Sequence, residues 1–248
     1  MNDTIQKKAI IIGAGIAGLS LAVRLQSKGI QVSVFEANKY PGGKLTELSK
    51  KGYRFDMGPS LFTMPQFVEE LFSISNKNIN HYFSYKKKET VCHYFYNDGT
   101  FFKASSNTDT FSSDAANVFD VKKNTLVNYF KKSKKKYELT SSLFLEKSLH
   151  KISTYLSKDT LKAIFNIRNL DINISLHEYN TSNFNDPKLI QLFDRFATYN
   201  GSSPYLTPGI MSMIPHLEQY YGTFFPKGGM HSITESIYKL AQDLGVQF

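Results

Sequence analysis

Residues 9–18 read Ala9-Ile10-Ile11-Ile12-Gly13-Ala14-Gly15-Ile16-Ala17-Gly18, and this stretch decides the fold. Its first four residues form a short apolar run, which is typical of a fully buried parallel strand. Apolar residues then recur with helical spacing as far as Leu25, and Gly29 is placed to end that helix. Residues 31–36 alternate and are rich in β-branched side chains, which predicts a second strand. The segments together predict a complete strand–turn–helix–strand unit.

The three glycines of the turn have the spacing of a dinucleotide-binding loop. Gly13 allows the tight turn, Gly15 lets a pyrophosphate approach the backbone, and Gly18 lets the helix pack close to the sheet. The helix N-terminus then offers free N–H groups and a partial positive charge to phosphates. The alternative is a glycine-rich turn without a ligand. We favour nucleotide binding because every part of the unit is in register.

An acidic residue, Glu36, ends the second strand about 20 residues beyond the glycines. At that position its carboxylate can accept hydrogen bonds from both ribose hydroxyls, and it repels a 2′-phosphate, which argues against NADP. The alternative is a solvated surface glutamate.

Charge and cysteine content limit the function classes. The 248 residues carry a net charge of +9 and one cysteine, Cys92, so no disulfide can form within the chain and a reducing, cytoplasmic compartment is expected. Lysine runs at 86–88 and 131–136 fit plain solvation first, an anionic membrane surface second and nucleic acid last, since no nucleic-acid motif accompanies them. No stretch approaches the ~20 apolar residues of a membrane span.

Further elements can be predicted along the chain. Thr63-Met64-Pro65 opens a helix, Asn97-Asp98-Gly99 joins two strands of a hairpin, and residues 109–176 are mostly helical. Asp186-Pro187 caps another helix. Ser232-Ile233-Thr234-Glu235 fits a capping box for a last helix that stops at Gly245, after which residues 246–248 begin a strand.

Two segments after Glu36 indicate which cofactor the unit takes. Pro41-Gly42-Gly43-Lys44 resembles the second glycine pair of flavin amine oxidases and carotenoid desaturases, and the resemblance places Lys44 near a flavin. Gly52-Tyr53-Arg54-Phe55-Asp56-Met57-Gly58-Pro59-Ser60 resembles the phytoene-desaturase signature, a turn beside the flavin ring. The choice of FAD rests on this resemblance.

Three more segments, at 96–100, 193–201 and 224–230, resemble bacterial carotenoid desaturases, above all the hydroxycarotenoid 3,4-desaturases. The resemblance implies removal of two hydrogens from a carbon–carbon bond of a carotenoid polyene, with FAD accepting hydride. The cofactor carries the difficult step, so such an enzyme needs little side-chain chemistry. The catalytic residues cannot be named from the sequence, which predicts no metal site. Arg195 and Tyr199, one helical turn apart, are candidates to meet a substrate end group. A surface arginine and a packed tyrosine are the alternative.

The resemblance implies an α/β fold: a Rossmann-like FAD-binding domain of the GR2 type with an inserted α+β substrate domain. We expect an FAD-binding part at 1–80, a substrate- and membrane-associated part at 81–222, and a return toward the FAD-binding region at 223–248. Family members are about twice this length by resemblance, so the C-terminal part of the family fold is expected to be missing. The predicted cofactor-binding residues are Gly13, Ala14, Gly15, Ile16, Ala17, Gly18, Glu36, Ala37, Gly43, Lys44, Gly58, Pro59 and Ser60.

A carotenoid substrate is apolar and dissolves in the bilayer, so the resemblance also implies peripheral attachment to a membrane. The candidate docking surface is Lys131–Lys136, among the apolar residues Leu126, Tyr129, Phe130 and Tyr137. Two rival interpretations remain. One is another enzyme of the same superfamily, such as an amine oxidase or a retinol-saturase-like enzyme, and the other is an inactive remnant that binds only nucleotide or a partner.

Overall fold

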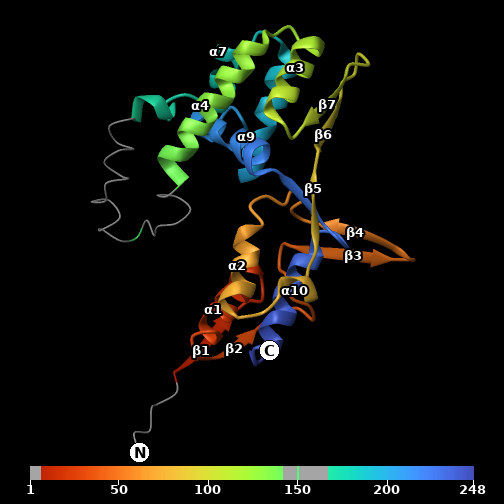
Figure 1. Ribbon diagram of the computed structural model, residues 1–248, viewed down its shortest axis with the longest axis vertical. Helices are drawn as coiled ribbons and strands as arrows, with labels where there is room; N and C mark the ends of the chain where they lie inside the picture. The colour runs from red at the N-terminus through yellow and green to blue at the C-terminus, as the bar shows by residue number, and fades with distance from the viewer. Residues whose placement is uncertain (1–6, 142–149, 151–166) are drawn as a thin grey trace, which may run out of the picture. The chain divides into compact units, whose positions relative to one another are not determined.

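The computed structural model describes residues 7–141, 150 and 167–248 (Figure 1). Contacts divide the chain into two compact units, the first made of Met1–Lys88 with Thr223–Phe248 and the second of Glu89–Gly222. The first unit is therefore discontinuous, and the second is inserted into it.

The first unit contains the predicted strand–helix–strand unit. β1 (Lys8–Ile12) and β2 (Gln31–Phe35) pair in parallel, with Ile10 opposite Ser33, and α1 (Ile16–Gln26) connects them. Gln247 forms an isolated parallel bridge to Ser33 on the other side of β2, within the segment 246–248 where the sequence predicts the start of a strand. The α/β fold class is confirmed.

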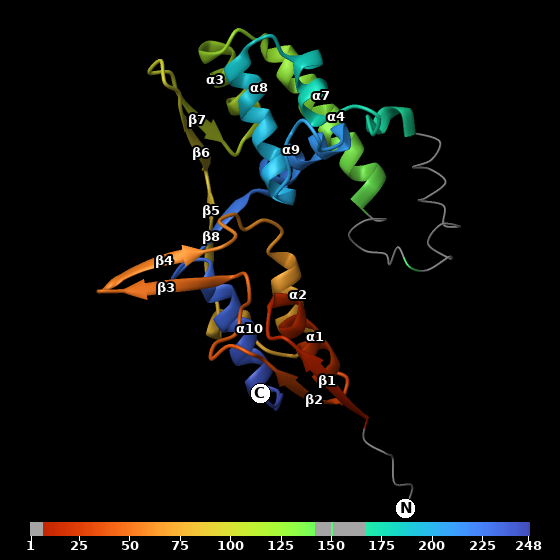
Figure 2. The ribbon, with the colours of Figure 1, turned by 180° about the vertical axis from the view of Figure 1, so that it is seen from behind.

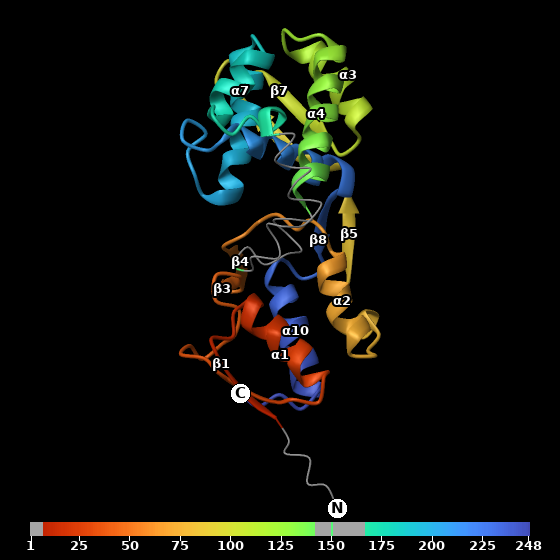
Figure 3. The ribbon, with the colours of Figure 1, turned by 90° about the vertical axis from the view of Figure 1, so that its left-hand side faces the viewer.

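One face of this sheet is covered by two helices that lie side by side, α1 and α10 (His231–Asp243) (Figure 3). The alternation of β2 directs Val32 and Val34 into the core beneath them, where both are almost fully buried. α1 contributes Leu19, Ala22 and Val23, none of which retains exposed surface.

The rest of the first unit consists of two antiparallel strand pairs and a helix (Figure 2). β3 (Thr46–Lys50) pairs with β4 (Tyr53–Met57), and β5 (Tyr85–Lys88) pairs with β8 (Thr223–Pro226). α2 (Gln66–Ile74) follows Pro65, as the sequence predicts, and a 3₁₀ turn, η1 (Ile79–His81), follows α2.

The second unit is a β-hairpin packed on helices. β6 (Thr90–Phe95) and β7 (Phe101–Ser105) form the predicted hairpin around Asn97-Asp98-Gly99. The other described elements are α3 (Thr108–Val118), α4 (Lys123–Ser141), η3 (Ile167–Leu170), α7 (Leu176–Asn183), α8 (Pro187–Asp194), η4 (Arg195–Asn200), η5 (Gly209–Met213), α9 (Ile214–His216) and the π-helical η6 (Leu217–Tyr221). The helical prediction for 109–176 is confirmed through 141, and residues 142–149 and 151–166 lie outside the described residues.

Two predicted helix caps had different outcomes. Asp186 caps α8, where its carboxylate accepts the amides of Lys188 and Leu189. The capping box predicted at Ser232 is wrong, because α10 begins at His231 and Ser232 therefore lies inside its first turn. The Ser232 hydroxyl donates to the Gly229 carbonyl, 2.7 Å away. The capping box that does form is Ser175 with Glu178, at the start of α7.

The docking surface expected around the lysines of α4 is also corrected. Leu126, Tyr129, Phe130 and Tyr137 are all buried, because the apolar stripe of α4 faces the core of the second unit. Lys136 is buried as well, at 2% exposure. Of the lysines in this run, Lys131, Lys132, Lys134 and Lys135 remain exposed, so the expected surface keeps its charge but not the four apolar residues expected to anchor it.

Candidate dinucleotide-binding site

The second glycine pair lies against the first glycine loop. Gly42 and Gly15 form a parallel β-bridge, and the Gly42 amide donates to the Ala14 carbonyl over 2.8 Å. Gly43 approaches so closely that a Cβ on it would lie 3.5 Å from the Gly15 Cα. Two motifs that are distant in the sequence therefore form one backbone surface.

The two later glycines of the loop have different roles. A Cβ on Gly18 would overlap the Gly13 carbonyl oxygen, so Gly18 is needed for the helix to pack on the strand. A Cβ on Gly15 would meet no atom within 4 Å, so the space at the tip of α1 is open. No side chain caps α1, and the first-turn amides of an α-helix have no acceptor within the helix. This open, uncapped tip fits a diphosphate.

Glu36 lies beside the same loop. Its Oε2 accepts a hydrogen bond from the Ala14 amide at 2.7 Å, and its Oε1 accepts from the amide and side chain of Asn38 at 2.9 and 3.0 Å. The bonds from Asn38 and then Ala14 lower the pKa of Glu36, so the side chain is a carboxylate at neutral pH. An ionised acceptor at the end of β2 is the group that ribose hydroxyls require. Ala37, which follows, is exposed.

The Gly58 turn joins this region through the backbone. A Cβ on Gly58 would overlap the Lys44 carbonyl oxygen, so the two segments are in contact. The side chains of Lys44, Pro59 and Ser60 are exposed. The structure therefore brings the predicted residues of 13–18, 36, 43–44 and 58–60 to one region of the first unit.

Sequence reasoning assigned no role to the residues that tie α10 to this region. Asp56 accepts the Met230 amide at 3.0 Å and the Arg54 guanidinium at 2.7 Å. His231 and Thr234 both hydrogen-bond the Leu45 carbonyl, each at 3.0 Å. Met230, His231 and Thr234 lie more than 170 positions from their partners Asp56 and Leu45, so no local pattern could have identified these contacts.

Arg195 and Tyr199, the candidate substrate contacts, belong to a buried cluster of the second unit. Arg195 donates to both oxygens of Glu218, at 2.9 and 3.1 Å, and its Nε donates to the Tyr94 hydroxyl at 2.8 Å. The Tyr199 hydroxyl donates to Glu218 over 2.6 Å. Glu218 is 1% exposed. Arg195 is thus a partly exposed arginine held in an ion pair, and Tyr199 is a packed tyrosine.

Electrostatics hold this cluster together. Burial alone would lower the pKa of Arg195, but the neighbouring Glu218 carboxylate raises it above its usual value. Burial, with Glu218 adding to it, raises the pKa of Tyr199, which stays a neutral donor. Contact of Arg195 and Tyr199 with a substrate stays a prediction. Among the described residues, no group of three or more His, Cys, Asp or Glu side chains could hold a metal ion.

The fold and the glycine loops define the class of protein. Residues 16–248 match the family described as flavin containing amine oxidoreductase, and the chain belongs to this family. It is a family of flavin-containing oxidoreductases, and membership of this family indicates FAD as the cofactor.

Among curated proteins, the chain is 59% identical over 242 residues to a 1-hydroxycarotenoid 3,4-desaturase of Flavobacterium sp. (strain P99-3). This match covers 98% of the chain and 49% of that protein. It is 32% identical over 250 residues to a 4,4'-diapolycopene oxygenase of Methylomonas sp, covering 100% of the chain and 49% of that protein. The chain thus spans about half the length of the curated relatives it matches.

Solved structures support the fold. An oxidoreductase from Methanosarcina mazei has a TM-score of 0.59 at 20% identity, over 97% of this chain and 50% of that one. Putrescine oxidase with bound putrescine has a TM-score of 0.58 at 16% identity, over 97% and 50%. At these identities the likeness shows the fold alone.

Proposed function

We propose that this chain supplies the FAD-binding half of a carotenoid desaturase. The observation that carries the proposal is the convergence of Gly15, Gly43 and Gly58, with Glu36 beside them, in a chain 59% identical to a 1-hydroxycarotenoid 3,4-desaturase. The tip of α1 would hold the FAD diphosphate, and the Glu36 carboxylate would accept the ribose hydroxyls.

Bound FAD would supply the two-electron oxidant that takes up a hydride from a saturated carbon of the polyene, and the proton lost from the adjacent carbon would pass to water. The chain's own residues contribute binding and position. The open tip of α1 receives the diphosphate, the Gly43 and Gly58 segments bring backbone close to the cofactor, and Glu36 fixes the adenosine end. These binding and positioning roles do not themselves require a side-chain acid or base.

A second polypeptide segment is needed to cover the sheet of the first unit. On the face opposite α1, Ile10 is 71% exposed, Ile12 is 89% exposed and Phe35 is 61% exposed. Parallel sheets are normally covered on both faces, and an apolar patch of this kind marks an interface. We propose that it is covered by a segment equivalent to the second half of the relatives, whether that half is joined to this chain or separate.

Peripheral membrane association is part of the same proposal, because the substrate is apolar. No helix in the described residues is both long enough and apolar enough to span a bilayer. The exposed lysines of α4 support attraction to anionic headgroups, although the buried aromatic residues beside them cannot insert. The single cysteine is consistent with a reducing, cytoplasmic setting.

Complementation tests the proposal. The chain would be co-expressed with the second half of the Flavobacterium relative in a host that accumulates a 1-hydroxycarotenoid. We expect a product with two hydrogens fewer and a longer-wavelength absorption, and we expect the Gly15→Val variant to form none. An unchanged carotenoid together with a stable, FAD-containing complex would favour another substrate class, such as amines. A complex without FAD would favour an inactive remnant.

A further inference from the structure

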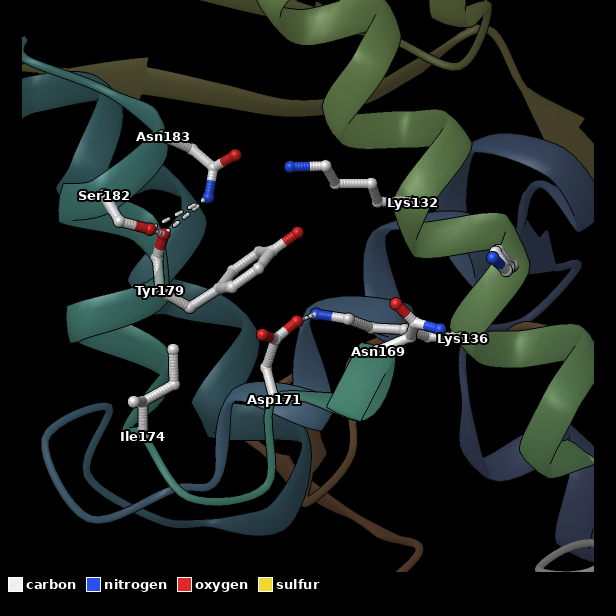
Figure 4. Close-up of a pocket in the computed structure, with 9 residues that line it drawn as sticks. Lys132, Lys136, Asn169, Asp171, Ile174, Tyr179, Ser182 and Asn183 are labelled. Carbon is white, nitrogen blue, oxygen red and sulfur yellow. Dashed lines mark hydrogen bonds and ion pairs between the residues drawn. The ribbon is translucent and has the colours of Figure 1, made fainter. Parts of the chain in front are cut away.

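A polar cavity of about 450 Å³ lies in the second unit between α4 and α7 (Figure 4). The residues that face each other across it are spaced i, i+3 and i+4 on both helices, which places each set on one helix face. They are Lys132, Lys135 and Lys136 from α4, and Tyr179, Ser182 and Asn183 from α7.

The cavity carries an excess of positive charge. The buried Lys136 is neutralised by Asp171, whose Oδ2 lies 2.7 Å from its Nζ, and it also donates to the Ser212 hydroxyl at 2.6 Å. Lys132 and Lys135 are exposed, and neither forms an ion pair with any residue in the described part of the chain. Within the described part of the chain, two cationic groups on this wall therefore lack a counter-charge.

A buried hydrogen-bond donor also faces the cavity. Tyr179 is 4% exposed, and its hydroxyl makes no hydrogen bond to any described residue. The hydroxyl points across the cavity toward α4, while Lys136 lies 3.6 Å from the centre of its ring (Figure 4). The Ser212 side chain is near enough to act on the pKa of Tyr179, which it lowers, but its hydroxyl donates to the Gly209 carbonyl and accepts from Lys136. Burial raises the pKa of Tyr179 to about 12, so the group remains a donor at neutral pH.

We propose that this cavity binds a phosphate-type oxyanion, with Lys132 and Lys135 balancing its charge and the Tyr179 hydroxyl donating to one of its oxygens. Donors arranged on two facing helices suit a tetrahedral, multiply charged anion, and the Tyr179 hydroxyl, which has no acceptor among the described residues, is placed to donate to it. A lipid headgroup phosphate and a soluble phosphate share this chemistry. The site does not depend on the proposed desaturase activity.

The test compares two lysine pairs on different faces of α4, and in the control pair Lys134 also lies 3.7 Å from Glu138. Lys132→Gln with Lys135→Gln removes the cations that line the cavity. Lys131→Gln with Lys134→Gln removes the same charge from exposed positions of α4 that do not line it. A third variant, Tyr179→Phe, removes only the hydroxyl and keeps the ring under Lys136. Circular dichroism and the unfolding temperature without ligand confirm that each variant folds.

Two probes separate the sources of the anion. The full chain would be titrated with inorganic phosphate, against chloride at equal ionic strength, with the rise in unfolding temperature as the measure. It would also be co-sedimented with phosphatidylcholine vesicles with and without phosphatidic acid. Binding of free phosphate identifies a soluble ligand, whereas binding only to the phosphatidic acid vesicles identifies a headgroup.

We expect the Lys132/Lys135 variant to lose binding and Tyr179→Phe to weaken it about tenfold, the effect of one hydrogen bond to a charged group. The Lys131/Lys134 variant should bind like the wild type. If both double-lysine variants lost the same amount of binding, the anion would be held by diffuse attraction to α4, and the proposed site would be overturned. Wild-type affinity in Tyr179→Phe, or failure of the wild type to bind either probe, would overturn it too.

Discussion

Glu36 accepts a hydrogen bond from the backbone amide of Ala14, with 2.7 Å between the amide nitrogen and Oε2. This bond ties the acid at the end of β2 to the glycine loop that precedes α1. The carboxylate therefore supports the loop that is proposed to hold the diphosphate, in addition to its proposed contact with the ribose.

Glu36→Ala should weaken FAD binding by about tenfold or more, because it removes a charged acceptor from the ribose and a support from the loop. Fluorescence titration with FAD measures the effect. Glu36→Gln keeps an acceptor on a side chain of the same length, so its affinity for FAD should lie between those of Glu36→Ala and the wild type. Equal affinity in all three proteins would remove Glu36 from the site.

Substitution by alanine should affect the stability of the chain differently at Gly15 and at Gly18. Gly15→Ala should leave the urea midpoint unchanged, because a Cβ there meets open space. Gly18→Ala should destabilise the chain by about 1–3 kcal/mol despite the helix propensity of alanine, because its Cβ would overlap the Gly13 carbonyl oxygen. A stabilised Gly18→Ala variant would contradict the close packing of α1 on β1.

The strand–helix–strand unit could be predicted because its signals are local. The apolar run at 9–12, the glycine spacing and the alternation at 31–36 each act within a few residues, and each element forms where it was expected. The capping box at Ser232 failed because the same residues also fit the first turn of a helix that begins at His231.

Contacts between distant segments could not be predicted. The meeting of Gly15 with Gly42, and of Asp56 with Met230, depends on how β3, β4 and α10 pack in three dimensions. The lysines of α4 were misjudged for a related reason. A lysine-rich helix suggests a fully solvated surface, but its register turns Tyr129 and Phe130 into the core and buries Lys136 with them.

Arg195→Met should destabilise the second unit by about 3–5 kcal/mol, because it leaves the Glu218 carboxylate buried without a counter-charge. The double variant Arg195→Met with Glu218→Met should recover much of this loss, since no charge is then stranded. Urea unfolding measures both. An unchanged midpoint in the single variant would show that this ion pair does not support the fold.

Stability should fall as the pH rises above about 10. Burial raises the pKa of Tyr85 and of Tyr96 to about 12, whereas an unfolded tyrosine titrates near 10. Between these values the native state holds more protons than the unfolded state, so the free energy of unfolding decreases with pH. Lys136, whose pKa is lowered by burial, acts in the opposite direction but is a single group. The urea midpoints at about pH 8 and about pH 11 measure the change in stability. The fall in midpoint should be smaller in Tyr96→Phe. A midpoint that rises with pH would contradict this prediction.

The most direct test of the dinucleotide site is the unfolding temperature of the full chain with increasing FAD, in the wild type and in Gly15→Val. Valine would fill the open tip of α1 without disturbing the packing behind it. We expect FAD to raise the unfolding temperature of the wild type in a saturable way and to leave that of Gly15→Val unchanged. No rise in the wild type, or the same rise in both proteins, would contradict the assignment.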